Sequence, residues 1–110
     1  MTPAEFTDRV RRDLATVRER LPGFRLKARV CFQPYDRDNM PCGCALTVVV
    51  LATLPNVVAI SSDEILGTDR CWRVGCVNGF DDHLDRFRAG DPDYDAGYAC
   101  GQAARVLLEE

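Results

Sequence analysis

The residues from Ala45 to Leu54 form the longest predominantly apolar run in the chain, A-L-T-V-V-V-L-A-T-L. The run is too short to cross a bilayer, and turn residues bound it on both sides, with Cys42-Gly43-Cys44 before it and Pro55-Asn56 after it. A β-branched run of this length between turn residues predicts a buried strand. Its alternate residues would form one apolar face and one mixed face, so both faces need cover.

A second strand is predicted by the alternation of apolar and polar residues from Phe24 to Gln33. Paired antiparallel with residues 45–54, it would place its apolar face beside that of the central strand. Its polar face carries Arg25, Lys27 and Arg29. We expect this basic row to be exposed or paired with acids from the second half of the chain.

A helix is predicted at the start of the chain. Thr2 and Glu5 have the spacing of a capping box, with Pro3 at the first helical position. The residues that follow recur at helical spacing and form one apolar stripe, made of Phe6, Val10, Leu14, Val17 and Leu21. Pro22-Gly23 would end the helix.

The last third of the chain predicts a helical hairpin. The first helix would run from about Gly75 to Ala89-Gly90, with an apolar stripe that includes Leu84 and Phe87, and Asp91 or Asp93 would open the second helix. Both helices contain glycines four residues apart, namely Gly75, Gly79, Gly97 and Gly101. Each costs a helix about 1 kcal/mol relative to alanine, so we expect close approach of the two helices to offset that cost.

These elements predict a single α+β domain spanning residues 1–110. It would contain an amino-terminal helix, a small antiparallel sheet of two or three strands, and a carboxy-terminal helical hairpin covering the sheet. Val57–Ile60 could supply the third strand.

The glycine-aromatic pattern of the hairpin, V-N-G-F-D-D-H followed by D-A-G-Y-A-C-G, resembles the short helical hairpins of ribosome modulation factor and related small phage-type proteins. The matching positions are packing residues, and the basic character of the ribosome-facing family is absent. The resemblance therefore implies a helical hairpin and no function.

Charge divides the chain into a basic and an acidic half. Residues 1–60 hold nine Arg or Lys and six Asp or Glu, whereas residues 61–110 hold five and eleven, for a net charge of -3. The arginines of the first helix have no interleaved aromatic residues for base stacking, so nucleic-acid binding is not expected. With no signal segment, lipidation motif or membrane span in the sequence, the expected location is the cytoplasm.

Six cysteines are the most prominent chemical feature, and in the cytoplasm they would stay reduced. Cys42, Cys44, Cys71 and Cys76 could converge on a structural zinc ion, although neither pair has the usual zinc-knuckle spacing. A thiol-dependent enzyme is a second alternative, in which a cysteine would pair with His83, the only histidine.

The usual catalytic motifs are absent from the sequence, so we expect a small regulatory or inhibitory protein, of the sort found in mobile elements, that binds another protein. The long connection after the second strand and the acidic face of the hairpin are the candidate surfaces. Their residues are Tyr35, Arg37, Met40, Asp81, Asp82, Asp85, Asp93 and Asp95. The mixed face of the central strand, if left uncovered, further suggests a homodimer.

Overall fold

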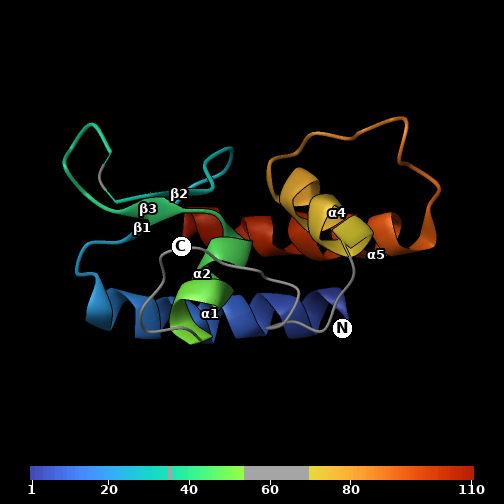
Figure 1. Ribbon diagram of the computed structural model, residues 1–110. Coiled ribbons are helices and arrows are strands. Elements are labelled where there is room, and N and C mark those ends of the chain that lie inside the picture. Colours follow the sequence, from blue (N-terminus) through green and yellow to red (C-terminus); the bar gives the residue numbers. More distant parts are fainter. Residues whose placement is uncertain (35, 54–69) are drawn as a thin grey trace.

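The computed structural model describes residues 1–34, 36–53 and 70–110 and confirms an α+β fold (Figure 1). Its elements, in chain order, are α1 (Pro3–Arg20), β1 (Arg25–Leu26), β2 (Phe32–Gln33), β3 (Cys42–Gly43), α2 (Ala45–Thr53), α4 (Arg70–Phe80), α5 (Pro92–Ala104) and the 3-10 helix η1 (Arg105–Glu109). Figure 1 shows α1 and α5 side by side, α4 crossing α5, and the small sheet beside α2. None of the described helices combines the length and apolar character needed to cross a membrane.

Helix α1 forms as its sequence predicts. The Thr2 hydroxyl accepts a hydrogen bond from the Glu5 amide at 3.1 Å, and the Glu5 carboxylate accepts one from the Thr2 amide at 3.2 Å, so the capping box is present. The apolar stripe from Phe6 to Val17 is buried, and Leu21 is partly buried at the end of the helix. This stripe faces α2 and α5 and supplies one wall of the core.

The predicted central strand is wrong, because residues 45–53 form the helix α2. An apolar run of this length fits a buried helix as well as a buried strand, and periodicity alone does not separate the two. The run is buried on several sides of the helix, as expected of a helix that is apolar all round. Arg20 donates to the carbonyl oxygens of Leu51 and Ala52 at 3.0 and 3.1 Å. It thereby supplies a hydrogen-bond partner to two carbonyl groups in the last turn of the helix. The strand face on which a homodimer was expected therefore does not exist.

The sheet is mixed rather than antiparallel. Its strand order is β1-β3-β2, with β1 parallel and β2 antiparallel to β3. The predicted strand 24–33 is split into β1 and β2, because the chain reverses at Arg29, whose φ is +64°. The Asp81 carboxylate accepts a hydrogen bond from the Arg29 amide at 2.6 Å and holds this turn against the end of α4. The predicted strand 57–60 lies outside the described residues.

The glycine-mediated approach of the two last helices is confirmed. A Cβ atom at Gly75 or Gly79 would overlap the backbone carbonyl group of Tyr94 or Tyr98 in α5. In the reverse direction, a Cβ at Gly97 or Gly101 would overlap the carbonyl oxygen of Trp72 or Cys76 in α4. The two backbones are therefore in direct contact. The two helices run in the same direction, because Gly75 meets Tyr94 and Gly79 meets Tyr98, so they do not form the predicted hairpin. The pair packs against α1 and α2 rather than covering the sheet.

Helix α4 starts earlier and ends earlier than its apolar spacing predicts. It begins at Arg70 and stops at Phe80, where the His83 amide donates to the Asn78 carbonyl and the Asp82 amide to the Gly79 carbonyl. These two bonds, with Asp82 at a φ of +56°, make a Schellman motif. Residues 81–91 therefore form a loop instead of a continued helix.

Candidate functional site

A buried tyrosine anchors the loop of residues 81–91. Tyr94 is fully buried, and its hydroxyl oxygen accepts hydrogen bonds from the Asp85 amide at 2.9 Å and from the Asn78 side chain at 3.0 Å. The tyrosine belongs to α5 and Asn78 belongs to α4. One side chain therefore ties the middle of the loop to both helices that carry it.

Aspartate side chains fix the rest of this loop. The Asp85 carboxylate accepts a hydrogen bond from the Phe87 amide at 3.0 Å and forms an ion pair with Arg88 at 3.2 Å. Asp91 caps α5 by accepting from the amides of Asp93 and Tyr94, both at 3.0 Å. These bonds give the loop a defined shape although it contains no helix or strand.

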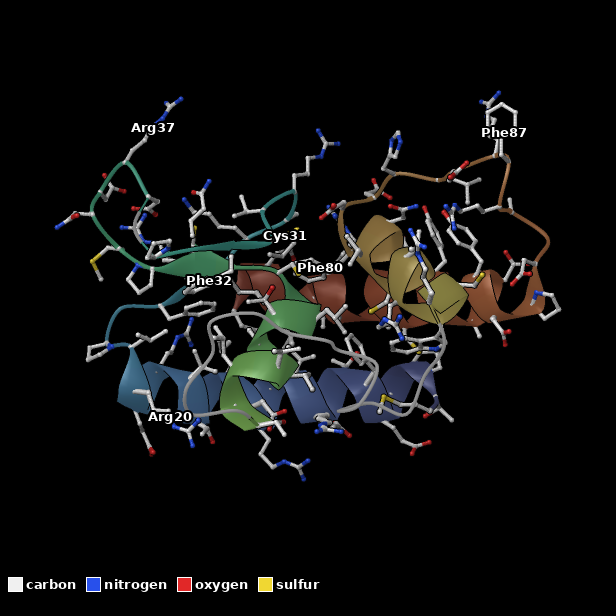
Figure 2. All side chains as sticks on the ribbon, viewed as in Figure 1. Arg20, Cys31, Phe32, Arg37, Phe80 and Phe87 are labelled. Carbon is white, nitrogen blue, oxygen red and sulfur yellow. The ribbon has the colours of Figure 1, made fainter. Side chains whose placement is uncertain are left out.

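The defined loop holds apolar side chains out into solvent. Phe87 has an exposed fraction of 102% and Leu84 one of 48%. Figure 2 shows Phe87 pointing away from the body of the molecule, at the outer side of the loop. Large exposed apolar side chains held on an ordered loop are typical of interaction surfaces.

Hollows lie along the outer face of α4 beside this loop. One, about 590 Å³, lies between α4 and the loop, and its lining includes Val74, Asn78 and Phe87. A second, about 220 Å³, is lined by α4 itself and shares Val74 and Asn78 with the first. A third, about 360 Å³, shares Val77 with the second and reaches α2 and β2. The three together are called the α4 groove below.

The rim of the α4 groove is basic. Arg86 and Arg88 line the hollow under the loop, and Arg73 lines the hollow on α4. The one carboxylate among the residues lining these two hollows belongs to Asp85, which is paired with Arg88. The groove therefore combines a half-exposed apolar floor with excess positive charge at one end, although the whole chain carries a net charge of -3.

Most carboxylates of the predicted acidic face form hydrogen bonds with other residues of the same chain. The carboxylates of Asp81, Asp82 and Asp95 accept hydrogen bonds from the Arg29 amide, the Gln102 side chain and the Gly90 amide, respectively. Asp85 holds the loop, and Asp93 lies in the first turn of α5. The role of these five residues in partner binding stays a prediction, and their contacts show a structural use for most of them.

The predicted binding loop between β2 and β3 divides into two kinds of residue. Arg37 lies exposed at its tip and points outward (Figure 2). Met40 instead packs back against Gly23, where a Cβ atom would overlap its terminal methyl group. Tyr35 lies outside the described residues. Of the two predicted contact residues that the structure describes in this loop, Arg37 is exposed to a partner and Met40 is packed against the body of the protein.

Asp36 organises that loop and pairs with the basic row of β1. Its carboxylate accepts a hydrogen bond from Lys27 at 2.9 Å and from the amides of Asp38 and Met40, and its side chain is 6% exposed. Arg25 pairs with Asp38 at 2.8 Å. Arg25 and Lys27 are therefore neutralised by acids of the same half of the chain, whereas Arg29 contacts Asp81 of the second half.

The Lys27 ammonium group and the two loop amides lower the pKa of Asp36 from 3.8 to about 2. Because this pKa is lower in the folded protein than in the unfolded chain, ionised Asp36 stabilises the fold fully above about pH 4, and the contribution is lost as the pH falls through about 2. We expect Asp36→Asn to lower the melting temperature at neutral pH and to flatten its decline between these pH values. Thermal melts of both proteins across this range test the expectation, with Asp8→Asn on α1 as the control. Parallel pH curves for the parent and Asp36→Asn would contradict it.

The four cysteines of the predicted zinc site do not gather around one point. Cys42, Cys44 and Cys76 are buried, and Cys71 is half-buried. Across residues 1–34, 36–53 and 70–110, no three His, Cys, Asp or Glu side chains are arranged to hold a metal ion. All six cysteines are free thiols. Burial raises the pKa of Cys44, Cys76 and Cys100, so these thiols are protonated at neutral pH in the folded protein.

His83 lies in the loop and lines the hollow between the loop and α4. None of the residues lining that hollow is a cysteine. The structure thus brings no thiol into that hollow beside the imidazole, and the thiol-enzyme alternative gains no support from it.

The residues that the sequence analysis missed are Leu84 and Phe87. Their helical spacing from Phe80 assigned them to a buried stripe, whereas they are exposed on the loop. The available signal was the run Asp81-Asp82-His83, because aspartate tolerates the left-handed conformation that ends a helix. No family model, curated protein or solved structure matches this chain.

Proposed function

We propose that this protein is a non-enzymatic binding protein that recognises another protein through the α4 groove and the 81–91 loop. The observation that carries the proposal is the complete exposure of Phe87 on a loop held by the buried Tyr94 hydroxyl. Burying such a side chain in a partner is worth about 1.5 to 3 kcal/mol. Because the loop is already ordered by internal hydrogen bonds, little conformational entropy is lost when it binds.

The chemistry of the groove selects the kind of partner. Its half-exposed floor, which includes Val74 and Val77, fits apolar side chains. Its basic rim, with Arg86 at the loop end, fits carboxylates. The proposed partner is therefore a protein segment that carries apolar residues together with Asp or Glu. A regulatory or inhibitory role would follow from blocking or holding that segment.

Selection of peptides from a random displayed library against the full chain tests this proposal. We expect the selected peptides to be enriched in apolar residues and in Asp and Glu. Phe87→Ala should weaken their binding by about 30-fold, since anchoring aromatic residues commonly contribute about 2 kcal/mol or more. Arg86→Glu should also weaken peptide binding at low salt, and peptide binding to this variant should depend less on salt concentration than binding to the parent. Fluorescence anisotropy with the selected peptides measures both effects.

Matched controls separate the groove from the rest of the surface. Val106→Ala removes another half-exposed apolar side chain, and Arg12→Glu reverses an exposed charge on α1. Both should leave peptide affinity within about twofold of the parent. Selected peptides that are basic, or that bind Phe87→Ala as well as the parent, would overturn the proposal. So would a concentration-dependent homodimer that Phe87→Ala dissociates, because the loop would then bind a second copy of this chain.

A further inference from the structure

Cys31 and Cys44 occupy opposite positions across the β2–β3 pair. The antiparallel register joins Phe32 to Gly43 and Gln33 to Cys42, so its continuation by one step joins Cys31 to Cys44. The Cys44 amide donates to the Cys31 carbonyl at 3.1 Å, which confirms that continuation. Opposite residues in an antiparallel pair have Cα atoms about 4.5 to 5.5 Å apart, a separation that a disulfide bridges without moving the backbone.

The two cysteines also lie beside the same hollow. Both cysteines line the third hollow of the α4 groove, which has a volume of about 360 Å³. In the neighbouring pair, the Cys42 thiol lies 3.8 Å from the Gln33 side-chain oxygen, so the side chains of that pair lie on one face. Cys31 and Cys44 flank the two-residue strands β2 and β3, and the hollow that both residues line places them side by side.

The two cysteines differ in exposure, so an oxidant can reach one of them more easily than the other. Cys31 is exposed and lies just before β2, and Figure 2 shows it near the place where the sheet meets α2. Cys44 is 3% exposed, at the start of α2, with its sulfur 3.3 Å from the Thr47 hydroxyl oxygen. The same hydroxyl donates to the Cys31 carbonyl at 2.7 Å. Thr47 therefore holds the backbone of one cysteine while contacting the thiol of the other.

We propose that Cys31 and Cys44 are a redox-modifiable pair that a hydroperoxide converts into an intramolecular disulfide. The Cys31 sulfur attacks the terminal peroxide oxygen, the O–O bond breaks, and Cys31 becomes a sulfenic acid while hydrogen peroxide yields water. The Cys44 sulfur then attacks the Cys31 sulfur, the S–O bond breaks, and a second water leaves with the Cys44 proton. Two thiols lose two electrons in total, and the peroxide gains them. This pairing rests on residues other than the loop and holds whether or not the groove binds a partner.

Peptide mapping of the native full-length chain tests the pair. The protein is treated with hydrogen peroxide, its remaining thiols are alkylated, and it is digested with trypsin, which cleaves after Arg29 and Arg37 and so separates the two cysteines. We expect a cross-linked peptide joining Cys31 to Cys44, loss of two alkylatable thiols per chain, and recovery of both with dithiothreitol. Tandem fragmentation distinguishes Cys44 from Cys42 in the same peptide.

Two variants serve as comparison. Cys31→Ser changes an exposed residue and should abolish the cross-link with no change in melting temperature, whereas Cys71→Ser should leave the cross-link intact. Oxidation of Cys31 to sulfinic acid while Cys44 stays alkylatable would overturn the proposal. A disulfide that joins two chains through Cys31, or one that uses Cys42, would also overturn it.

Discussion

Gly101→Ala is expected to destabilise the protein by about 3 kcal/mol, the upper part of the range seen when an extra methyl group is forced into a packed interior. A Cβ at this position would overlap the Cys76 carbonyl oxygen and lie 2.6 Å from the Phe80 amide nitrogen. Both are backbone atoms of α4, so no side chain can rotate to make room. Helix propensity alone predicts the opposite sign, a gain of about 1 kcal/mol. Thermal and urea unfolding followed by circular dichroism measure the difference.

The control for this substitution is Ala96→Leu, which adds a larger side chain to the same helix at an exposed position. It should change the free energy of unfolding by less than about 0.5 kcal/mol. If Gly101→Ala is as stable as the parent or more stable, then the two backbones are not in contact and the described arrangement of α4 and α5 is incorrect.

Tyr94→Ala is expected to destabilise the protein by about 4 kcal/mol, which is typical of removing a fully buried aromatic ring. The ring lies in the core between the helices, and its hydroxyl holds the Asp85 amide and the Asn78 side chain. The loss therefore combines a cavity with two unsatisfied donors. Chemical denaturation at neutral pH measures it.

Tyr94→Phe separates the two contributions, because it keeps the ring and removes the hydroxyl. We expect a smaller loss of about 1 kcal/mol, the usual net contribution of a hydrogen bond, because both donors are only part-buried. Faster proteolysis after Arg86 and Arg88 in Tyr94→Phe than in the parent would show that the loop has lost its anchor. Equal stability of Tyr94→Phe and the parent would mean that the hydroxyl does not hold the loop.

The parts of the fold that could be predicted from sequence are those with local rules. The capping box at Thr2 and the stripe from Phe6 to Val17 involve residues three or four apart, and both form as expected. The glycine pairs in α4 and α5 were predictive for a related reason. Four glycines at helical spacing lower the stability of their helices, so a compensating close contact is expected, and the backbones of α4 and α5 make that contact.

The parts that failed depend on tertiary context. The valines of residues 48–50 favour a strand locally, but burial against α1 and capping by Arg20 stabilise a helix there. The turn at Arg29 depends on a carboxylate fifty-two residues away, at Asp81, and no local pattern indicates it. The position of the end of α4 determines the candidate site. Because the helix stops at the Schellman motif at Asp82, the two expected core residues Leu84 and Phe87 lie on the surface.

The backbone contact between α4 and α5 also constrains the order in which the chain can acquire its structure. Gly97 and Gly101 of α5 leave the room into which the Trp72 and Cys76 carbonyls of α4 fit. Neither helix therefore has its final partner until both have left the ribosome. During synthesis, the surface of α4 that contacts α5 therefore stays uncovered until residue 104 has emerged, and it is open to chaperones for that interval.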